Sequence, residues 1–334
     1  MFHSSRWDYA YTGGDERGGL VKLRGKRVAV VGSGASAAQV IPHVAEYAER
    51  HYVVQRTPSG VDRREEKPTD PQWTASLAPG WQKRMIENFT ALTSGAGAEE
   101  DLIDDGWTFL FAKIGALGGG ASLEELLLAA EQADAKKMNE LRERINQTVK
   151  DPVIAGVEHE VDALIFASGF EIAADPVLRN GFSIIGRDGL GLKDKWRRQG
   201  ISTFHGMMTH GFPNFFIHQP AQGALAANFC HGLDENAQHI RYIVGEAEKA
   251  GALWLEATAE AEAGWVETCG AVNGIALDFL KTCTPGYYNA EGKIDPEAMK
   301  GYGFGLGPVM FFNIFRSWRE DGGLEGLALQ TRAA

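Results

Sequence analysis

Residues 26–58 read KRVAVVGSGASAAQVIPHVAEYAERHYVVQRTP, and this stretch decides the fold class. The apolar run Val28–Val31 predicts a buried strand, and Tyr52–Gln55 predicts a second one. Between them, Gly32 to Ala37 form a turn that leads into a segment of helical composition. A strand, a glycine turn, a helix and a strand in this order indicate a dinucleotide-binding unit whose strands lie parallel.

The turn matches the pattern G-x-G-x-x-A, and each small residue has a role in such units. Gly32 would allow the tight turn, Gly34 would let the backbone approach a pyrophosphate, and Ala37 would let the helix pack closely. The helix start offers N–H groups and the positive end of its dipole to phosphates. A purely structural turn is the alternative interpretation, in which Ser36 satisfies backbone N–H groups. The polar side chains that we expect to join the phosphate contacts are Ser33, Ser36 and Gln39.

The end of the second predicted strand favours NADPH over NADH. NAD sites usually carry Asp or Glu about 20 residues after the glycines, to bind the ribose 2′-hydroxyl. This sequence instead reads Gln55-Arg56-Thr57. Arg56 can pair with a 2′-phosphate through charge-assisted hydrogen bonds. We therefore expect Arg56 and Thr57 to lie at the cofactor; a solvated arginine at a strand end is the alternative.

The composition is that of an ordinary globular chain and argues against several classes of protein. The 334 residues are 44% hydrophobic and 23% charged, and the formal net charge is −11. Such a charge argues against a nucleic-acid partner, and no apolar run is long enough for a membrane span. The three cysteines show no metal-ligand spacing, so we expect no metal site, reduced thiols and a cytoplasmic protein. They are Cys230, Cys269 and Cys283.

A second informative stretch, VDALIFASGF, covers residues 161–170. Val161–Ala167 predicts a further strand of the same parallel sheet. It ends in Ser168 and Gly169, and small residues at a strand end let the backbone come close to a ligand or to a crossing chain. A strand end before a turn, without a ligand, is the alternative interpretation of this stretch alone. We therefore count Ser168 and Gly169 among the cofactor-binding residues.

Together with the first residues of the chain, these motifs resemble the flavin-dependent monooxygenases of the Baeyer–Villiger type. His3 and Trp7 keep the H-x-x-x-W half of a fingerprint that precedes the NADPH glycine turn in that family. Asp162 to Phe170 match D-x-x-x-x-A-[ST]-G-F. Three later stretches are also similar to family members: GMMTHGFPNFFIHQPAQGALAANF at 206–229, CTPGYYNAEG at 283–292 and GPVMFFNIFRSWREDGGLEGLAL at 307–329.

The resemblance implies an NADPH- and FAD-dependent monooxygenase that inserts one oxygen atom of O₂ beside the carbonyl of a small-molecule ketone. It implies that His3 couples the fingerprint to movement of the cofactor domain, although a frayed terminal residue is the alternative. Gln222 and Asn228 would face the flavin. The connection DPVIAGVEHE at 151–160 lacks the family's Lys-Arg pair, so the catalytic residues stay unassigned. The other interpretations are a related N-oxygenase or reductase, an NADPH-binding remnant, or a subunit of a split flavoenzyme without oxygenase activity of its own.

We predict an α/β architecture with a Rossmann-like NAD(P)/FAD-binding fold, a parallel sheet, a helical insertion and an incomplete flavin domain. The family's first glycine turn, which holds FAD, has no match here. We therefore expect weak retention of FAD by this chain alone, and a complementing chain or a homo-oligomer that covers open sheet edges. The expected parts are a fingerprint linker at 1–24, an NADPH domain at 25–170 with the insertion at 67–150, and part of the FAD domain at 171–334. The expected later elements are a helix at 123–149, strands near 182–186 and 214–218, and helices at about 233–250, 254–281 and 308–320.

Overall fold

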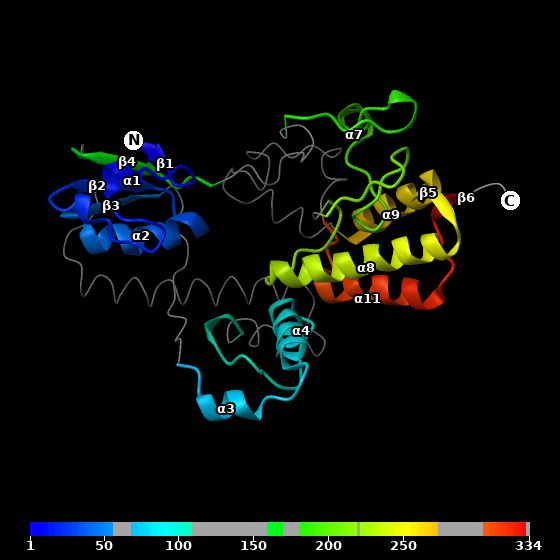
Figure 1. The fold of residues 1–334 in the computed structure, drawn as a ribbon, viewed down its shortest axis with the longest axis horizontal. Coiled ribbons are helices and arrows are strands. Elements are labelled where there is room, and N and C mark those ends of the chain that lie inside the picture. The colour runs from blue at the N-terminus through cyan, green and yellow to red at the C-terminus, as the bar shows by residue number, and fades with distance from the viewer. Residues whose placement is uncertain (56–67, 109–158, 170–180, 219–220, 273–302, 332–334) are drawn as a thin grey trace. The chain divides into compact units, whose positions relative to one another are not determined.

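The computed structural model describes residues 1–55, 68–108, 159–169, 181–218, 221–272 and 303–331 (Figure 1). The chain divides into two compact units. The first consists of Met1–Asp62 and Gln132–Glu171, and the second of Arg63–Glu131 and Ile172–Ala334. The helix expected at 123–149 lies outside the described residues, and the domain boundaries given above stay a prediction.

A four-stranded parallel sheet forms the first unit, in the order β1-β4-β2-β3. Val28 of β2 pairs with Ala163 of β4 on one side and with His51 of β3 on the other. The predicted parallel sheet of three strands is thereby confirmed. A fourth strand, β1, lies within the segment expected to be a linker. The strand bounds are β1 (Phe2–His3), β2 (Arg27–Val31), β3 (Arg50–Val54) and β4 (Ala163–Phe166).

Helix α2 (Ala35–Tyr47) packs on this sheet through the small side chains of one face. Ala37 and Val44 lie two helical turns apart and are both 0% exposed. They pack into one cluster with buried residues of β2 and β4, among them Val30 and Ile165. The chain between β1 and β2 forms the short helix α1 (Tyr9–Thr12) and a 3₁₀ turn, η1 (Val21–Leu23). The sheet and α2 thus give the strand–turn–helix geometry on which a dinucleotide site depends.

The second unit is built mainly from helices. Its core combines Phe311, Phe312 and Phe315 of α11 with Ile243 of α8 and Trp265 of α9. Helices α8 and α11 lie side by side (Figure 1), and α4 contacts both of them. The elements of this unit are α3 (Pro71–Ser76), α4 (Trp81–Thr93), η2 (Arg187–Gly189), α7 (Leu192–Gln199), α8 (Phe229–Lys249), β5 (Ala252–Ala257), α9 (Ala259–Val272), α11 (Gly307–Asp321) and β6 (Leu327–Thr331).

Three expected elements of the second unit are wrong or displaced. In the described residues around 182–186 there is one isolated bridge, Ile185 to Gly191, and residues 214–218 form a loop. The expected helix at 254–281 begins instead as β5, because Ala252–Ala257 pairs antiparallel with β6, whose paired residues lie 70 to 79 positions later. Pairing with a distant strand overrides the local helical pattern there. The helices expected at 233–250 and 308–320 are confirmed as α8 and α11.

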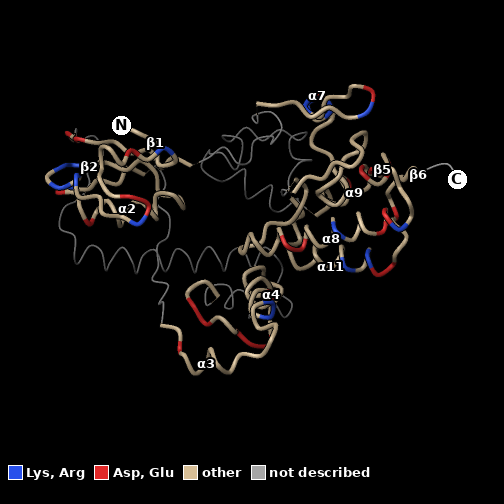
Figure 2. The backbone as a smooth tube through the Cα atoms, in the orientation of Figure 1, with Lys and Arg blue, Asp and Glu red and all other residues tan. Residues whose placement is uncertain are grey.

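Charged residues of both signs are spread over each unit, as Figure 2 shows. None of the helices within the described ranges is both long enough and apolar enough to cross a membrane.

Candidate dinucleotide-binding site

The candidate site lies at the edge of the parallel sheet where its strands end. Because all four strands run in the same direction, the residues that follow them meet at one edge. These are the glycine turn after β2, Ala167 to Gly169 after β4, and Ser4 and Ser5 after β1. Ligands of parallel α/β sheets bind at this carboxyl edge.

The two glycines of the turn differ in what surrounds them. Gly32 has φ +123°, and a Cβ there would lie 2.2 Å from the carbonyl oxygen of Ala167. Its N–H donates to the carbonyl of Val54 at 2.8 Å. Gly32 is therefore required by the fold itself, because the end of β4 passes directly in front of it.

Gly34, in contrast, is not required by the fold. Its backbone angles, φ −78° and ψ −171°, are extended and open to any residue. A Cβ at Gly34 would meet no atom within 4 Å. Glycine at this position leaves bare space directly before α2, which is the place where a pyrophosphate would approach the backbone.

The start of α2 carries the N–H groups that a phosphate would use. No side chain caps this helix end, so its first N–H groups are available to an anion. Ala37 is buried against the sheet and serves packing, as expected for the third small residue. Gln39 is exposed, and its amide donates to the carbonyl of Ala35 at 3.1 Å. In the structure Gln39 thus bonds its own helix, while Ser33 and Ser36 lie at the turn.

Of the four other residues predicted to bind the cofactor, the structure describes two. Ser168 and Gly169 follow β4 and lie at the same edge as the glycine turn, and Gly169 has φ +89°. Arg56 and Thr57 lie outside the described residues, so the selectivity for NADPH stays a prediction.

The fingerprint residues are part of the sheet or lie close to it. His3 is the last residue of β1 and pairs with Phe166 of β4. The His3 Nδ1 lies 2.8 Å from the Ser5 hydroxyl and accepts the Ser5 backbone N–H at 3.2 Å. The structure therefore brings His3 to the carboxyl edge, beside β4 and its following Ser168. Strand β1 was missed from the sequence because two residues carry no periodic pattern.

Trp7 is a packing residue of this segment. Its indole N–H donates to the Thr12 hydroxyl at 3.0 Å, and its ring meets Phe2 edge-on with centroids 5.3 Å apart. Both interactions fix the chain that leaves β1, so Trp7 anchors this segment through packing and a hydrogen bond.

Asp162 fixes the opposite, amino-terminal end of β4. Its carboxylate accepts the backbone N–H of Arg27 at 2.7 Å, and the Arg27 guanidinium also donates to it. Hydrogen bonds from the Arg27 backbone and side chain lower the pKa of Asp162. Asp162, the first residue of the D-x-x-x-x-A-[ST]-G-F motif, thus sets the register between β4 and β2. In this register Ser168 and Gly169 lie at the carboxyl edge of the sheet.

The residues expected to face a flavin have structural partners in the second unit. Gln222 is 0% exposed, and its side-chain amide oxygen Oε1 accepts the Thr203 backbone N–H and hydroxyl, each at 2.7 Å. Asn228 caps α8 by accepting the His231 N–H at 3.2 Å. The neighbouring histidines are hydrogen-bonded as well, since His210 contacts the carbonyl of Ala257 and His218 that of Leu233. Gln222 and Asn228 therefore shape the backbone of this region.

A buried ionic cluster in the second unit has no signal in the sequence. Lys195 and Glu262 are 6% and 5% exposed, and the Lys195 ammonium donates to both carboxylate oxygens at 2.7 and 2.8 Å. The hydroxyls of Ser202 and Thr209 also donate to Glu262, at 2.5 and 3.0 Å. Burial lowers the pKa of Lys195. The cluster joins α7 to α9 across 67 positions of sequence, which no local pattern reveals. No group of three or more metal-ligating side chains occurs in the residues that the structure describes.

Comparison with known proteins agrees with this geometry, although no family model matches the chain. The chain is 41% identical to neopentalenolactone D synthase of Streptomyces avermitilis, over 98% of its own length and 65% of that protein. It is 36% identical to Baeyer-Villiger monooxygenase 4 of a Dietzia species, over 99% of its length and 63% of that protein. Among solved structures, the polycyclic ketone monooxygenase of Thermothelomyces thermophila superimposes with a TM-score of 0.83 at 29% identity, over 99% of this chain and 64% of that one.

The chain thus spans slightly less than two thirds of the length of these proteins. The likeness is not confined to the glycine turn, because it runs through both units. The sequence identity and the shared fold agree with the motifs at the sheet edge, and they relate the chain to the Baeyer–Villiger type of flavoprotein monooxygenases.

Proposed function

We propose that the first unit binds NADPH at the turn between β2 and α2, as part of a Baeyer–Villiger oxygenation of a small-molecule ketone. The observation that carries the proposal is the bare space at Gly34. The backbone angles at Gly34 allow any residue, and a Cβ there would meet no neighbouring atom. A pyrophosphate in contact with the backbone, by contrast, would require a residue without a side chain. The uncapped start of α2 supplies N–H groups and a favourable dipole at the same place.

Different residues of the chain would bind different parts of NADPH. The backbone from Gly32 to Ala37 would hold the pyrophosphate, Arg56 would pair with the 2′-phosphate, and Ser168 and Gly169 would border the nucleotide from the end of β4. When bound, NADPH and FAD supply the electrons and the activation of O₂ for this chemistry. Orientation of the nicotinamide is the contribution that we propose for this unit.

The partners and the location of the protein are part of the same proposal. The substrates would be a ketone and O₂, and a complementing chain or a second copy would complete the assembly. The described thiols, Cys230 and Cys269, are both free, which supports a reducing compartment such as the cytoplasm.

The proposal is tested by replacing Gly34 with valine, which would fill the bare space. NADPH binding followed by nicotinamide fluorescence should weaken at least tenfold in Gly34→Val. The free energy of unfolding, measured with urea, should fall by no more than about 1 kcal/mol, the scale of a poorer residue at a helix start. A Gly34→Val protein that binds NADPH as tightly as the wild type would contradict the proposal.

Gly32→Ala is the matched control for this experiment. It should destabilise the protein by at least about 1–3 kcal/mol, because the residue would be strained at positive φ and would meet Ala167. The full reaction is then followed as ketone-stimulated NADPH consumption with added FAD. Ketone-stimulated consumption would support the oxygenation, whereas NADPH binding without such consumption would support the nucleotide site alone.

A further inference from the structure

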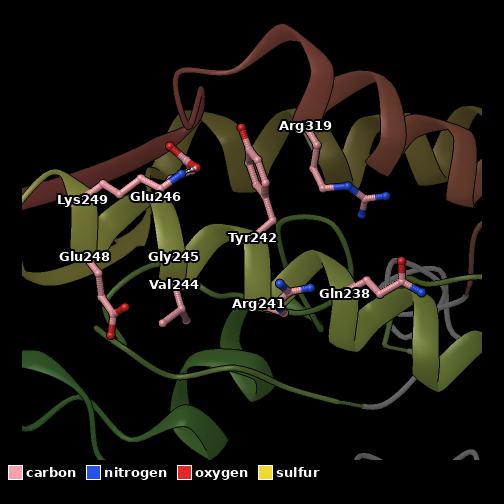
Figure 3. Close-up of a pocket in the computed structure, with 9 residues that line it drawn as sticks. All are labelled: Gln238, Arg241, Tyr242, Val244, Gly245, Glu246, Glu248, Lys249 and Arg319. Carbon is pink, nitrogen blue, oxygen red and sulfur yellow. Dashed lines mark hydrogen bonds and ion pairs between the residues drawn. The ribbon is translucent and has the colours of Figure 1, made fainter.

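A surface groove of about 610 Å³ runs along α8 in the second unit, with Arg319 of α11 at its rim (Figure 3). This volume falls within the range of small-molecule sites, about 300–1,000 Å³. Successive turns of α8 supply one stripe of lining residues, since positions three or four apart share a helix face. The stripe consists of Gln238, Arg241, Tyr242, Gly245 and Lys249.

Two arginines of the groove lack an acidic partner. In the described part of the chain, no carboxylate lies within 4.0 Å of the guanidinium of Arg241 or of Arg319, although Arg316 one turn earlier on α11 is paired with Glu235. Arg319 is half-buried, and its guanidinium donates to the Nδ1 of the neutral His239 at 3.4 Å. Burial lowers the pKa of Arg319. Glu235 and Glu320 attract Arg319 only from beyond 4.0 Å, so its guanidinium keeps donors for a directly bound anion.

The other charges of the groove do not neutralise these arginines. Lys249 is paired with Glu246 at 2.6 Å. Figure 3 shows this pair at one end of the groove and the guanidinium groups of Arg241 and Arg319 toward the other end. Glu248 is exposed and lies at the Lys249 end in the same view. The groove therefore has a cationic end, in a chain whose formal net charge is −11.

Gly245 is a second, independent sign that this groove is kept open. It lies inside the 21-residue helix α8, where glycine costs about 0.5–1 kcal/mol relative to alanine. A Cβ at Gly245 would meet no atom within 4 Å, so packing does not require the glycine. The missing side chain leaves the floor of the groove bare between its two charged ends.

We propose that this groove binds the phosphate group of a small molecule, with Arg241 and Arg319 as its ligands and the phenol of Tyr242 beside them. Two guanidinium groups carry two positive charges, which a phosphate group with up to two negative charges and three free oxygens matches more fully than a carboxylate with one charge and two oxygens. The site belongs to the second unit and is distinct from the NADPH site proposed in the first. It does not depend on the oxygenation chemistry.

The proposal is tested by calorimetric titration of the full chain with inorganic phosphate at constant ionic strength. One saturable site is expected in the wild type. Arg241→Gln and Arg319→Gln should each weaken phosphate binding at least tenfold, whereas Arg198→Gln, an exposed arginine of α7 outside the groove, should not change it. Gly245→Leu should abolish binding by filling the floor, while its circular dichroism stays that of the wild type.

Four results would overturn the proposal. The first is the absence of saturable phosphate binding. The second is unchanged binding in Arg241→Gln, whose exposed side chain can be replaced without harm to the core. The third is loss of binding in Gly34→Val alone, which would place the phosphate at the glycine turn. The fourth is tighter binding of succinate than of phosphate, which would assign the groove to a carboxylate.

Discussion

Arg56 is the single residue on which the expected choice of nicotinamide cofactor depends. No acid follows the second strand, so a 2′-phosphate would meet a cation there. Arg56→Ala should weaken NADPH binding by about 1.5–3 kcal/mol, or roughly 10–100-fold, because a hydrogen bond to a charged group is lost. The affinity for NADH should not change. Titration of both proteins with both cofactors checks this, and equal affinities of the wild type for NADPH and NADH would contradict it.

The buried pair His205 and His239 makes the stability of the second unit depend on pH. The two side chains are 5% and 0% exposed, and their ring nitrogens lie 3.1 Å apart. Burial lowers the pKa of His205 to about 3 and, with the nearby charges of His205 and Arg319, the pKa of His239 to about 2. Both are therefore neutral in the folded protein at neutral pH, whereas in the unfolded chain they titrate near 6.5.

The unfolded state therefore binds more protons than the folded state below about pH 6.5. The stability contributed by the neutral pair is present above that pH and is lost progressively as the pH falls toward the folded-state values. Each histidine should add up to about 1.4 kcal/mol per pH unit to the slope of the unfolding free energy. Urea denaturation between pH 7 and pH 4 measures this slope. His239→Gln should flatten it and the exposed His43→Gln should not; an equal slope in all three proteins would contradict the account.

At the scale of elements, α4 is held to α8 and α11 by buried polar contacts. The Thr90 hydroxyl of α4 lies 2.7 Å from the Nδ1 of His231 on α8, and Glu235 of α8 pairs with Arg316 of α11. His231 and Glu235 are one turn apart, with 3.8 Å between Nε2 and Oε1. A chain of polar side chains thus connects three helices that are distant in sequence.

Thr90→Val should destabilise the protein by about 1–3 kcal/mol, because it leaves a buried histidine nitrogen without its partner. Thr93→Val in the same helix is the control, since among the described residues the Thr93 hydroxyl bonds only carbonyls of its own helix, at Phe89 and Thr90. Its effect should stay near zero. Urea denaturation measures the free energy of unfolding of both variants. An equal loss in both would show that the Thr90–His231 contact does not contribute to stability.

The elements that could be predicted from the sequence are those with a strong local pattern. The apolar runs of β2, β3 and β4 and the turn at Gly32 required no knowledge of distant residues. Strand β5 was missed because its partner β6 lies at least 70 positions away, and β1 because it has two residues. The Lys195–Glu262 cluster could not be predicted either, because its two charged residues lie 67 positions apart in the sequence. The open space at Gly34 and the packing of Ala37 could be anticipated from spacing, whereas the hydrogen bonds of the Gln222 and Asn228 side chains could not.

At the scale of the whole molecule, we expect a protein of these 334 residues to retain little FAD. Within the described ranges, β2–α2 is the strand–glycine turn–helix unit, and one such unit holds one dinucleotide. Gln222 and Asn228 are engaged by Thr203 and His231 and so are not free to replace those contacts. The flavin-to-protein ratio of the purified chain, from its visible spectrum, should lie well below one. A stoichiometric, tightly held flavin would contradict this expectation.

The division of the chain into two units has a consequence for dissecting it. Each unit is made from two separate stretches, with Gln132–Glu171 returning to the first unit after Arg63–Glu131 has joined the second. The polypeptide therefore passes from one unit to the other three times. No single proteolytic cut or truncation can release either unit whole, and a gene fragment for the nucleotide unit must splice Met1–Asp62 directly to Gln132–Glu171. Strand β4 would be lost from any fragment that simply stopped after β3, and with it the carbonyl of Ala167 against which Gly32 is packed.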